Sequence, residues 1–139
     1  MDRVMYRSMK KDESGRPELG RSSRTLGVRV SAVGAIPEAG QAKFDVYPDA
    51  DSYVAPGRGM SVAMDHPANL PKHRKPQSLG GESRDPLFGI HLGAIRNTLH
   101  VNIDRPPHAL IEPATRCALA VYERALAATR SSWEEVAHV

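Results

Sequence analysis

The stretch LHVNIDRPPHALIEP, residues 99–113, decides the fold class of this 139-residue chain. Its first six residues alternate strictly between apolar and polar side chains, which is the pattern of a half-buried β-strand. The residues expected to face the core are Leu99, Val101 and Ile103, and those expected to face outward are His100, Asn102 and Asp104. The Arg-Pro-Pro sequence that follows predicts a turn, and residues 108–113 then form a second strand that Pro113 ends.

The periodicity changes after these two strands. From Ala114 onward apolar residues recur at helical spacing, which predicts one C-terminal helix over roughly residues 114–135, packed on a sheet. The residues that carry this spacing are Ala118, Leu119, Val121, Tyr122, Ala125, Leu126, Thr129 and Trp133. Earlier strands are expected at residues 3–9, 24–33, 60–65 and 87–92. Because strands come first and one long helix comes last, we expect an α+β protein with twisted antiparallel or mixed sheets.

Length and composition indicate a single domain covering residues 1–139. The formal charge of +3 is mild, which makes nucleic acid an unlikely partner. Cys117 is the sole cysteine, so no internal disulfide can form and a reducing compartment fits. No run approaches about 18 apolar residues, so no membrane span is expected. The N-terminal residues lack the apolar stretch of a signal peptide, which predicts synthesis in the cytoplasm.

The segment PGRGMSVAMD at residues 56–65 is a candidate binding element. Gly57 and Gly59 would let backbone N–H groups approach a ligand, and Ser61 at the edge of a strand could orient a ribose or a carboxylate. The alternative is an ordinary turn before a strand. The following residues 66–86 are rich in proline and glycine, and an irregular run of this length inside a compact domain is often functional.

Two charged positions on predicted strands could act on a ligand. Arg7 follows Tyr6 in the first strand and could bind a phosphate or carboxylate, unless it only faces solvent. Glu112 ends the last strand and could accept ribose hydrogen bonds or stabilise an oxocarbenium-like centre, unless it is an exposed edge residue. The run KHRKP at residues 72–76 could contact phosphate or an acidic partner, or simply be solvated.

Common catalytic motifs are absent from the sequence. There is no phosphate-binding loop, Rossmann glycine motif, zinc-protease motif or nucleophile elbow. His66 and His73 are spaced too loosely for a known zinc site, so no metal is expected. His100 and His108 flank the turn and could lie on paired strands.

Three motifs, taken in order, resemble a known family. They are Tyr6-Arg7 on an early strand, the segment from Pro56 to Asp65, and the His108, Ile111 and Pro113 pattern before a final helix with Tyr122 and Trp133. This arrangement resembles the small NAD-dependent, ADP-ribosyltransferase-like toxins that bacterial type VI secretion exports. The resemblance spans most of the chain, and it implies that the expected sheets form a cleft for NAD beside the C-terminal helix.

The resemblance also implies roles for individual residues. Arg7, Ser61 and Glu112 would be the catalytic residues, which hold the phosphates and ribose of NAD and stabilise charge at the ribosyl carbon. Tyr6, Arg7, Gly59, Ser61 and His108 would bind NAD, and residues 66–86 would be a flap across the cleft. The sequence departs from the family pattern at two places: Gly59-Met60-Ser61 replaces Ser-Thr-Ser, and Leu110 stands two residues before Glu112 where an acid or glutamine is usual.

Partners follow from the same resemblance. It implies an antibacterial effector that is delivered into the cytoplasm of target bacteria, where it consumes NAD as an ADP-ribosyltransferase or an NAD glycohydrolase. A cognate immunity protein would block the cleft, and the target molecule is not specified. Two alternatives remain open: a small basic α+β module that binds a protein or RNA without catalysis, and a transferase relative that handles RNA 2′-phosphates, which would need more clustered arginines and histidines.

Overall fold

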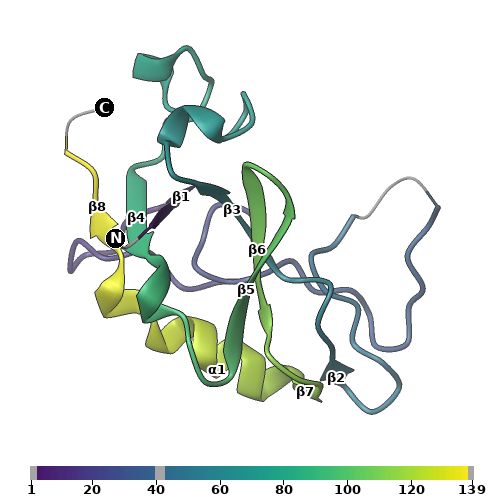
Figure 1. Ribbon diagram of the computed structural model, residues 1–139. Helices are drawn as coiled ribbons and strands as arrows, with labels where there is room; N and C mark the ends of the chain where they lie inside the picture. The colour runs from purple at the N-terminus through teal and green to yellow at the C-terminus, as the bar shows by residue number, and fades with distance from the viewer. Residues whose placement is uncertain (1–2, 40–42, 138–139) are drawn as a thin grey trace.

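The computed structural model describes residues 3–39 and 43–137 and is an α+β fold (Figure 1). Its strands are β1 (Val4–Ser8), β2 (Tyr53–Val54), β3 (Met60–Met64), β4 (Leu87–His91), β5 (Leu99–Arg105), β6 (His108–Pro113), β7 (Cys117–Ala118) and β8 (Glu134–Glu135). Its helices are α1 (Leu119–Ala128) and the 3₁₀ turns η1 (Pro67–Asn69), η2 (Gln77–Leu79), η3 (Leu92–Ala94) and η4 (Arg130–Ser132). Among the described residues, no helix is long and apolar enough to cross a bilayer.

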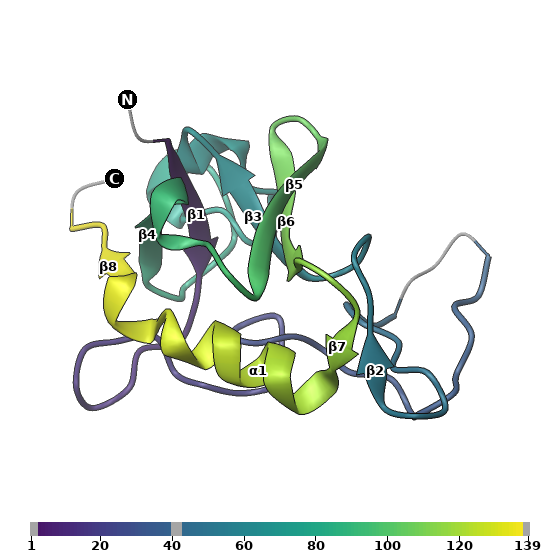
Figure 2. The ribbon, with the colours of Figure 1, turned by 60° about the horizontal axis from the view of Figure 1, so that its bottom comes forward.

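Six strands form one antiparallel sheet in the order β5-β6-β3-β1-β4-β8, and β2 pairs with β7 in a separate two-stranded ribbon. Helix α1 runs along one side of the six-stranded sheet, as Figure 2 shows. The tip of the β5–β6 hairpin projects away from this helix. The α+β class and its antiparallel sheet are therefore as the sequence predicts.

The sheet is weakly joined at its centre. β1 pairs with β4 along five residues and β3 pairs with β6 along four, but β1 and β3 share only the pairs Met5 with Met64 and Tyr6 with Ala63. Beyond Tyr6 the two strands diverge, which divides the sheet into a β5-β6-β3 half and a β1-β4-β8 half. Backbone groups on the inner edges of the opening lose their ladder partners and need others.

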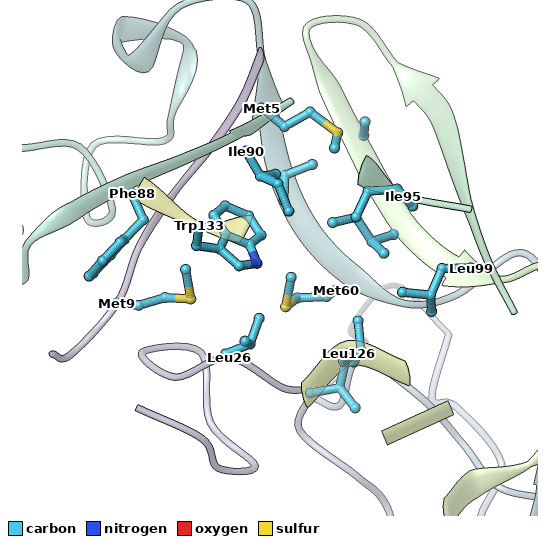
Figure 3. Close-up of a cluster of buried hydrophobic side chains, with 14 of the residues drawn as sticks. Met5, Met9, Leu26, Met60, Phe88, Ile90, Ile95, Leu99, Leu126 and Trp133 are labelled. Atoms are coloured by element: carbon cyan, nitrogen blue, oxygen red, sulfur yellow. The ribbon is translucent and has the colours of Figure 1, made fainter. Parts of the chain in front are cut away.

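One hydrophobic cluster joins the two halves to the helix. Trp133 is fully buried, and its indole Nε1–H donates to Thr129 Oγ1 at 3.1 Å. Figure 3 shows the indole ring among side chains from both halves of the sheet, including Phe88, Ile90 and Met60. Four of the five methionines are fully buried, and their flexible chains fill the space between sheet and helix.

Tyr122 fixes helix α1 to the sheet. Its hydroxyl donates to the carbonyl of Ile111 at 2.6 Å and accepts from the backbone N–H of Met60 at 3.2 Å. The hydroxyl therefore bridges the end of the β3–β6 ladder. Burial raises the pKa of Tyr122, so the phenol stays protonated and keeps its donor role.

Three sequence-based predictions are wrong. Residues 24–33 form no strand, since Leu26 and Val28 are buried but have only isolated bridges around them. The predicted helix over 114–135 is shorter, because its N-terminal part is β7 and its C-terminal part is η4 and β8. Ile103 was expected in the core but is 36% exposed, since it lies where the β5–β6 register shifts.

Removing one oxygen tests the attachment of the helix. Tyr122→Phe should lower the free energy of unfolding by about 1–3 kcal/mol, because the buried Met60 N–H and Ile111 carbonyl then lose their shared partner. Denaturant unfolding of the wild type and the variant measures the difference. Tyr53→Phe is the matched control, since Tyr53 is 37% exposed; equal losses in both variants would contradict the bridging role.

Candidate functional site

A cavity of about 470 Å³ opens where β1 and β3 diverge. Its walls come from these two strands, the tip of the β5–β6 hairpin and the irregular segment 66–86. The lining residues that carry charge or can carry it are Arg7, Arg29, Asp45, His73, Arg74, Arg105 and His108, and Ser61 adds a hydroxyl. Four arginines against one aspartate make this cavity strongly cationic, so it suits an anionic ligand.

Arg7 fills the opening between the two strands. It is only 5% exposed, and its guanidinium donates to backbone carbonyls alone. Nη1 donates to Ser61 at 2.9 Å, Nε donates to Thr25 at 3.3 Å, and Nη2 donates to Ser22, Thr25 and Gly27 at 3.0–3.3 Å. Arg7 therefore replaces the missing β1–β3 pairing at Ser61 and holds residues 22–27 against the sheet.

The charge of Arg7 has no direct counter-ion. No carboxylate within residues 3–39 and 43–137 lies at ion-pair distance from it. Burial lowers the pKa of Arg7 to about 10, which still leaves the group positive at neutral pH. A buried cation that only carbonyls satisfy projects a positive field into the adjacent cavity.

Arg74 is a second cation whose guanidinium donates to backbone carbonyls, although it is only half-buried. It comes from segment 66–86, and its Nη2 donates to the carbonyl oxygens of Ser8 and Ser23. Ser8 Oγ donates back to the Arg74 carbonyl at 2.6 Å. Burial lowers the pKa of Arg74. These bonds tie the segment to β1, so segment 66–86 forms a fixed wall of the cavity in this structure.

Polar groups with spare hydrogen-bonding capacity also face the cavity. Ser61 is half-buried on β3. His108 Nδ1 lies 2.7 Å from Asp104 Oδ1, which orients its ring, and Arg105 is largely exposed, 3.7 Å from Asp104. Arg29 is already paired with Asp45 at 2.9 Å. Ser61, His108 and Arg105 are thus the groups best able to contact a ligand directly.

Glu112 lies outside the cavity wall, four residues along β6 from His108. Its side chain is 7% exposed and accepts three hydrogen bonds: Oε1 from Gly57 N–H and from Asn102 Nδ2 at 3.0 Å each, and Oε2 from His100 Nδ1 at 2.9 Å. Burial alone would raise the pKa of Glu112, but these hydrogen bonds outweigh it and lower the pKa. The group is a buried, ionised carboxylate.

The other predicted site residues have different positions. Tyr6 is half-buried and packs on a separate apolar cluster with Ala63, Leu70 and Leu87. Gly59 is needed for packing, because a Cβ there would lie 2.3 Å from the Ile111 carbonyl oxygen. The structure thus brings Arg7, Ser61 and His108 to one cavity, and leaves Tyr6, Gly59 and Glu112 outside its lining.

Sequence reasoning missed much of the cationic lining. The sequence patterns do not mark Arg29, Asp45 or Arg105 as site residues, yet all three line the cavity. The run KHRKP at residues 72–76 was a usable signal, since His73 and Arg74 from it line the cavity. His66 caps η1 by accepting from Ala68 N–H at 3.0 Å, and the described part of the chain holds no cluster suited to a metal ion.

Comparison of the chain with protein-family models, with curated proteins and with solved structures finds no match.

The hydrogen bonds of Arg7 give it a structural role in addition to its place in the cavity. A side chain that only contacts a ligand can be removed with the fold intact. Arg7→Ala should instead lower the free energy of unfolding by at least about 3 kcal/mol, because it leaves several buried carbonyls unpaired. Arg105→Ala should change stability by less than about 0.5 kcal/mol, since Arg105 is 79% exposed. Denaturant unfolding compares the two, and a stable Arg7→Ala variant would show that Arg7 has no structural role.

Proposed function

We propose that this protein binds NAD in the cavity between β1 and β3 and cleaves the bond between nicotinamide and ribose, as an ADP-ribosyltransferase or an NAD glycohydrolase. The observation that carries the proposal is the cationic cavity that contains Arg7, Ser61 and His108 together. These residues come from three strands and are three of the five for which the family resemblance implies NAD contacts; the other two, Tyr6 and Gly59, lie outside the cavity lining. An antibacterial effector toxin with a cognate immunity protein is the biological role that this resemblance supports.

The charges of the cavity support a pyrophosphate ligand. The pyrophosphate of NAD carries two negative charges, and the buried Arg7 and the half-buried Arg74 are two cations without a carboxylate partner at ion-pair distance among the described residues. The N–H donors of these two arginines are largely engaged with backbone carbonyls. The arginines would therefore stabilise the pyrophosphate mainly through their positive electrostatic field and not through many direct hydrogen bonds. Ser61, His108 and Arg105 would supply direct hydrogen bonds to the phosphate oxygens.

The nicotinamide ribose would extend from the phosphates along β6. His108 and Glu112 lie on the same face of this strand, about 13 Å apart by strand geometry, with Leu110 between them. Cleavage of the nicotinamide–ribose bond develops positive charge on the ribose. Glu112 supplies an ionised carboxylate at that end of the site, where the family resemblance implies that a glutamate acts during cleavage.

One observation favours a second candidate function. The sequence alone did not reveal enough clustered arginines and histidines for a transferase relative that handles RNA 2′-phosphates. The cavity lining has four arginines and two histidines. The second candidate is therefore an enzyme that uses NAD to process a 2′-phosphorylated RNA end.

Incubation with NAD tests the proposal. The purified protein should release nicotinamide, and Ser61→Ala should slow the release by about 2- to 10-fold, because one hydrogen bond worth roughly 0.5–1.5 kcal/mol is lost. Exposed Ser131→Ala is the matched control and should leave the rate unchanged. Chromatography of NAD and nicotinamide measures the rate.

Different outcomes separate the candidates. Nicotinamide release with NAD alone, together with toxicity on expression in bacteria, supports the toxin. Release only when a 2′-phosphorylated oligoribonucleotide is added supports the RNA-processing candidate. No release under either condition contradicts both candidates and leaves the non-catalytic interaction module.

A further inference from the structure

A buried carboxylate and an exposed imidazole form a pair at the open end of the β5–β6 hairpin, away from its turn. His100 and Glu112 are directly opposite each other in the strand register, and His100 Nδ1 lies 2.9 Å from Glu112 Oε2. The side chain of His100 is 62% exposed, whereas that of Glu112 is 7% exposed. The imidazole is therefore the end of the pair that a ligand on this face would meet.

Both oxygens of the carboxylate are already in use. Oε1 accepts from Gly57 N–H and from Asn102 Nδ2, and Oε2 faces His100. Three donors hold the carboxylate in one orientation, two of them from β5 and one from the loop before β3. A direct contact between Glu112 and a ribose would displace one of these donors, so the carboxylate is better placed to act through His100.

The carboxylate also determines the tautomer of His100. An ionised carboxylate only accepts hydrogen bonds, so His100 Nδ1 must carry the proton and donate it. The lone pair of the neutral ring then lies on Nε2. Within residues 3–39 and 43–137, Nε2 of His100 has no hydrogen-bond partner. This geometry is that of an imidazole base oriented by a buried acid.

We propose that His100 is the general base of the reaction and that Glu112 is the residue that positions it. This inference rests on the proposed cleavage of NAD and names the group that activates the nucleophile. In hydrolysis, the water oxygen forms a bond to the ribosyl C1′ while the bond from C1′ to nicotinamide breaks. The bonding electron pair leaves with neutral nicotinamide, and the water proton moves to His100 Nε2 and then to solvent. In transfer, a nucleophilic group of the target replaces water.

The hydrogen bonds around Glu112 predict what a glutamine would do. In Glu112→Gln the amide oxygen must take the Oε1 position, because Gly57 N–H and Asn102 Nδ2 both need an acceptor there. The amide NH₂ then faces His100 Nδ1 and donates to it. His100 would be forced into the tautomer with the proton on Nε2, which cannot accept a proton from water.

Steady-state kinetics of NAD cleavage give the first test. His100→Gln and Glu112→Gln should each lower kcat by about 10²–10³-fold with little change in KM, since a positioned general base contributes about that much. The double variant should be no slower than either single variant, because both changes remove one function. Glu13→Gln, at an exposed glutamate, is the matched control and should match the wild type.

Imidazole ¹⁵N chemical shifts of His100 give a readout that does not depend on activity. The wild type should show the tautomer protonated on Nδ1, and Glu112→Gln should show the one protonated on Nε2. An unchanged tautomer overturns the positioning role of Glu112. Full activity in His100→Gln, or additive losses in the double variant, overturns the role of His100 but leaves NAD cleavage standing. No NAD cleavage by the wild type overturns the proposed function, and the role of His100 with it.

Discussion

The buried guanidinium of Arg7 is the interaction on which the candidate site depends. Two strands at the centre of an antiparallel sheet would normally pair along their length, but β1 and β3 pair at only two positions. Arg7 occupies the resulting opening and donates to Ser61 on one side and to the segment 22–27 on the other. A hydrogen-bonded charge in this place keeps the strands apart and leaves a cavity beside them.

Tyr122 supports the opening from the β6 side of β3. Its hydroxyl bridges the backbone of β3 and β6 at Met60 and Ile111, one residue away from the Arg7 contact on β3. Helix α1 therefore holds one edge of β3, and Arg7 donates a hydrogen bond to a backbone carbonyl on the other edge. The remaining polar residues of the site depend on this frame, because Ser61, His108 and Glu112 all project from β3 or β6.

The sequence predicts the regular parts of this molecule well and the irregular parts poorly. The strand 108–113 matches β6 in both bounds, because alternation and a terminal proline mark it clearly. Leu26 and Val28 alternate with polar residues or glycine as in a strand, yet they belong to an irregular segment. The side chains of these two residues pack in the core, and backbone carbonyls of the segment accept hydrogen bonds from Arg7. The apolar spacing typical of a helix continues past Ala128 because Trp133 is buried in the core, although the α-helix itself ends at Ala128.

The residues of the candidate site are likewise predicted only in part from the sequence. Six residues are predicted to lie near a common ligand. Arg7, Ser61 and His108 line one cavity, whereas Tyr6, Gly59 and Glu112 lie outside its lining. Arg29, Arg74 and Arg105 come from segments far apart in the chain, so no local spacing reveals that they converge. The pairing of His100 with Glu112 depends on strand register, which a single sequence does not specify for a hairpin with an irregular turn.

The most direct measurement is a titration with ADP-ribose monitored by backbone and side-chain NMR. ADP-ribose keeps the pyrophosphate of NAD but has no nicotinamide to lose, so it reports on binding alone. If the cavity between β1 and β3 is the ligand site, the resonances of Arg7, Ser61 and His108 should shift together and saturate. No saturable shift, or shifts confined to the separate surface pocket within residues 34–58, would contradict this assignment.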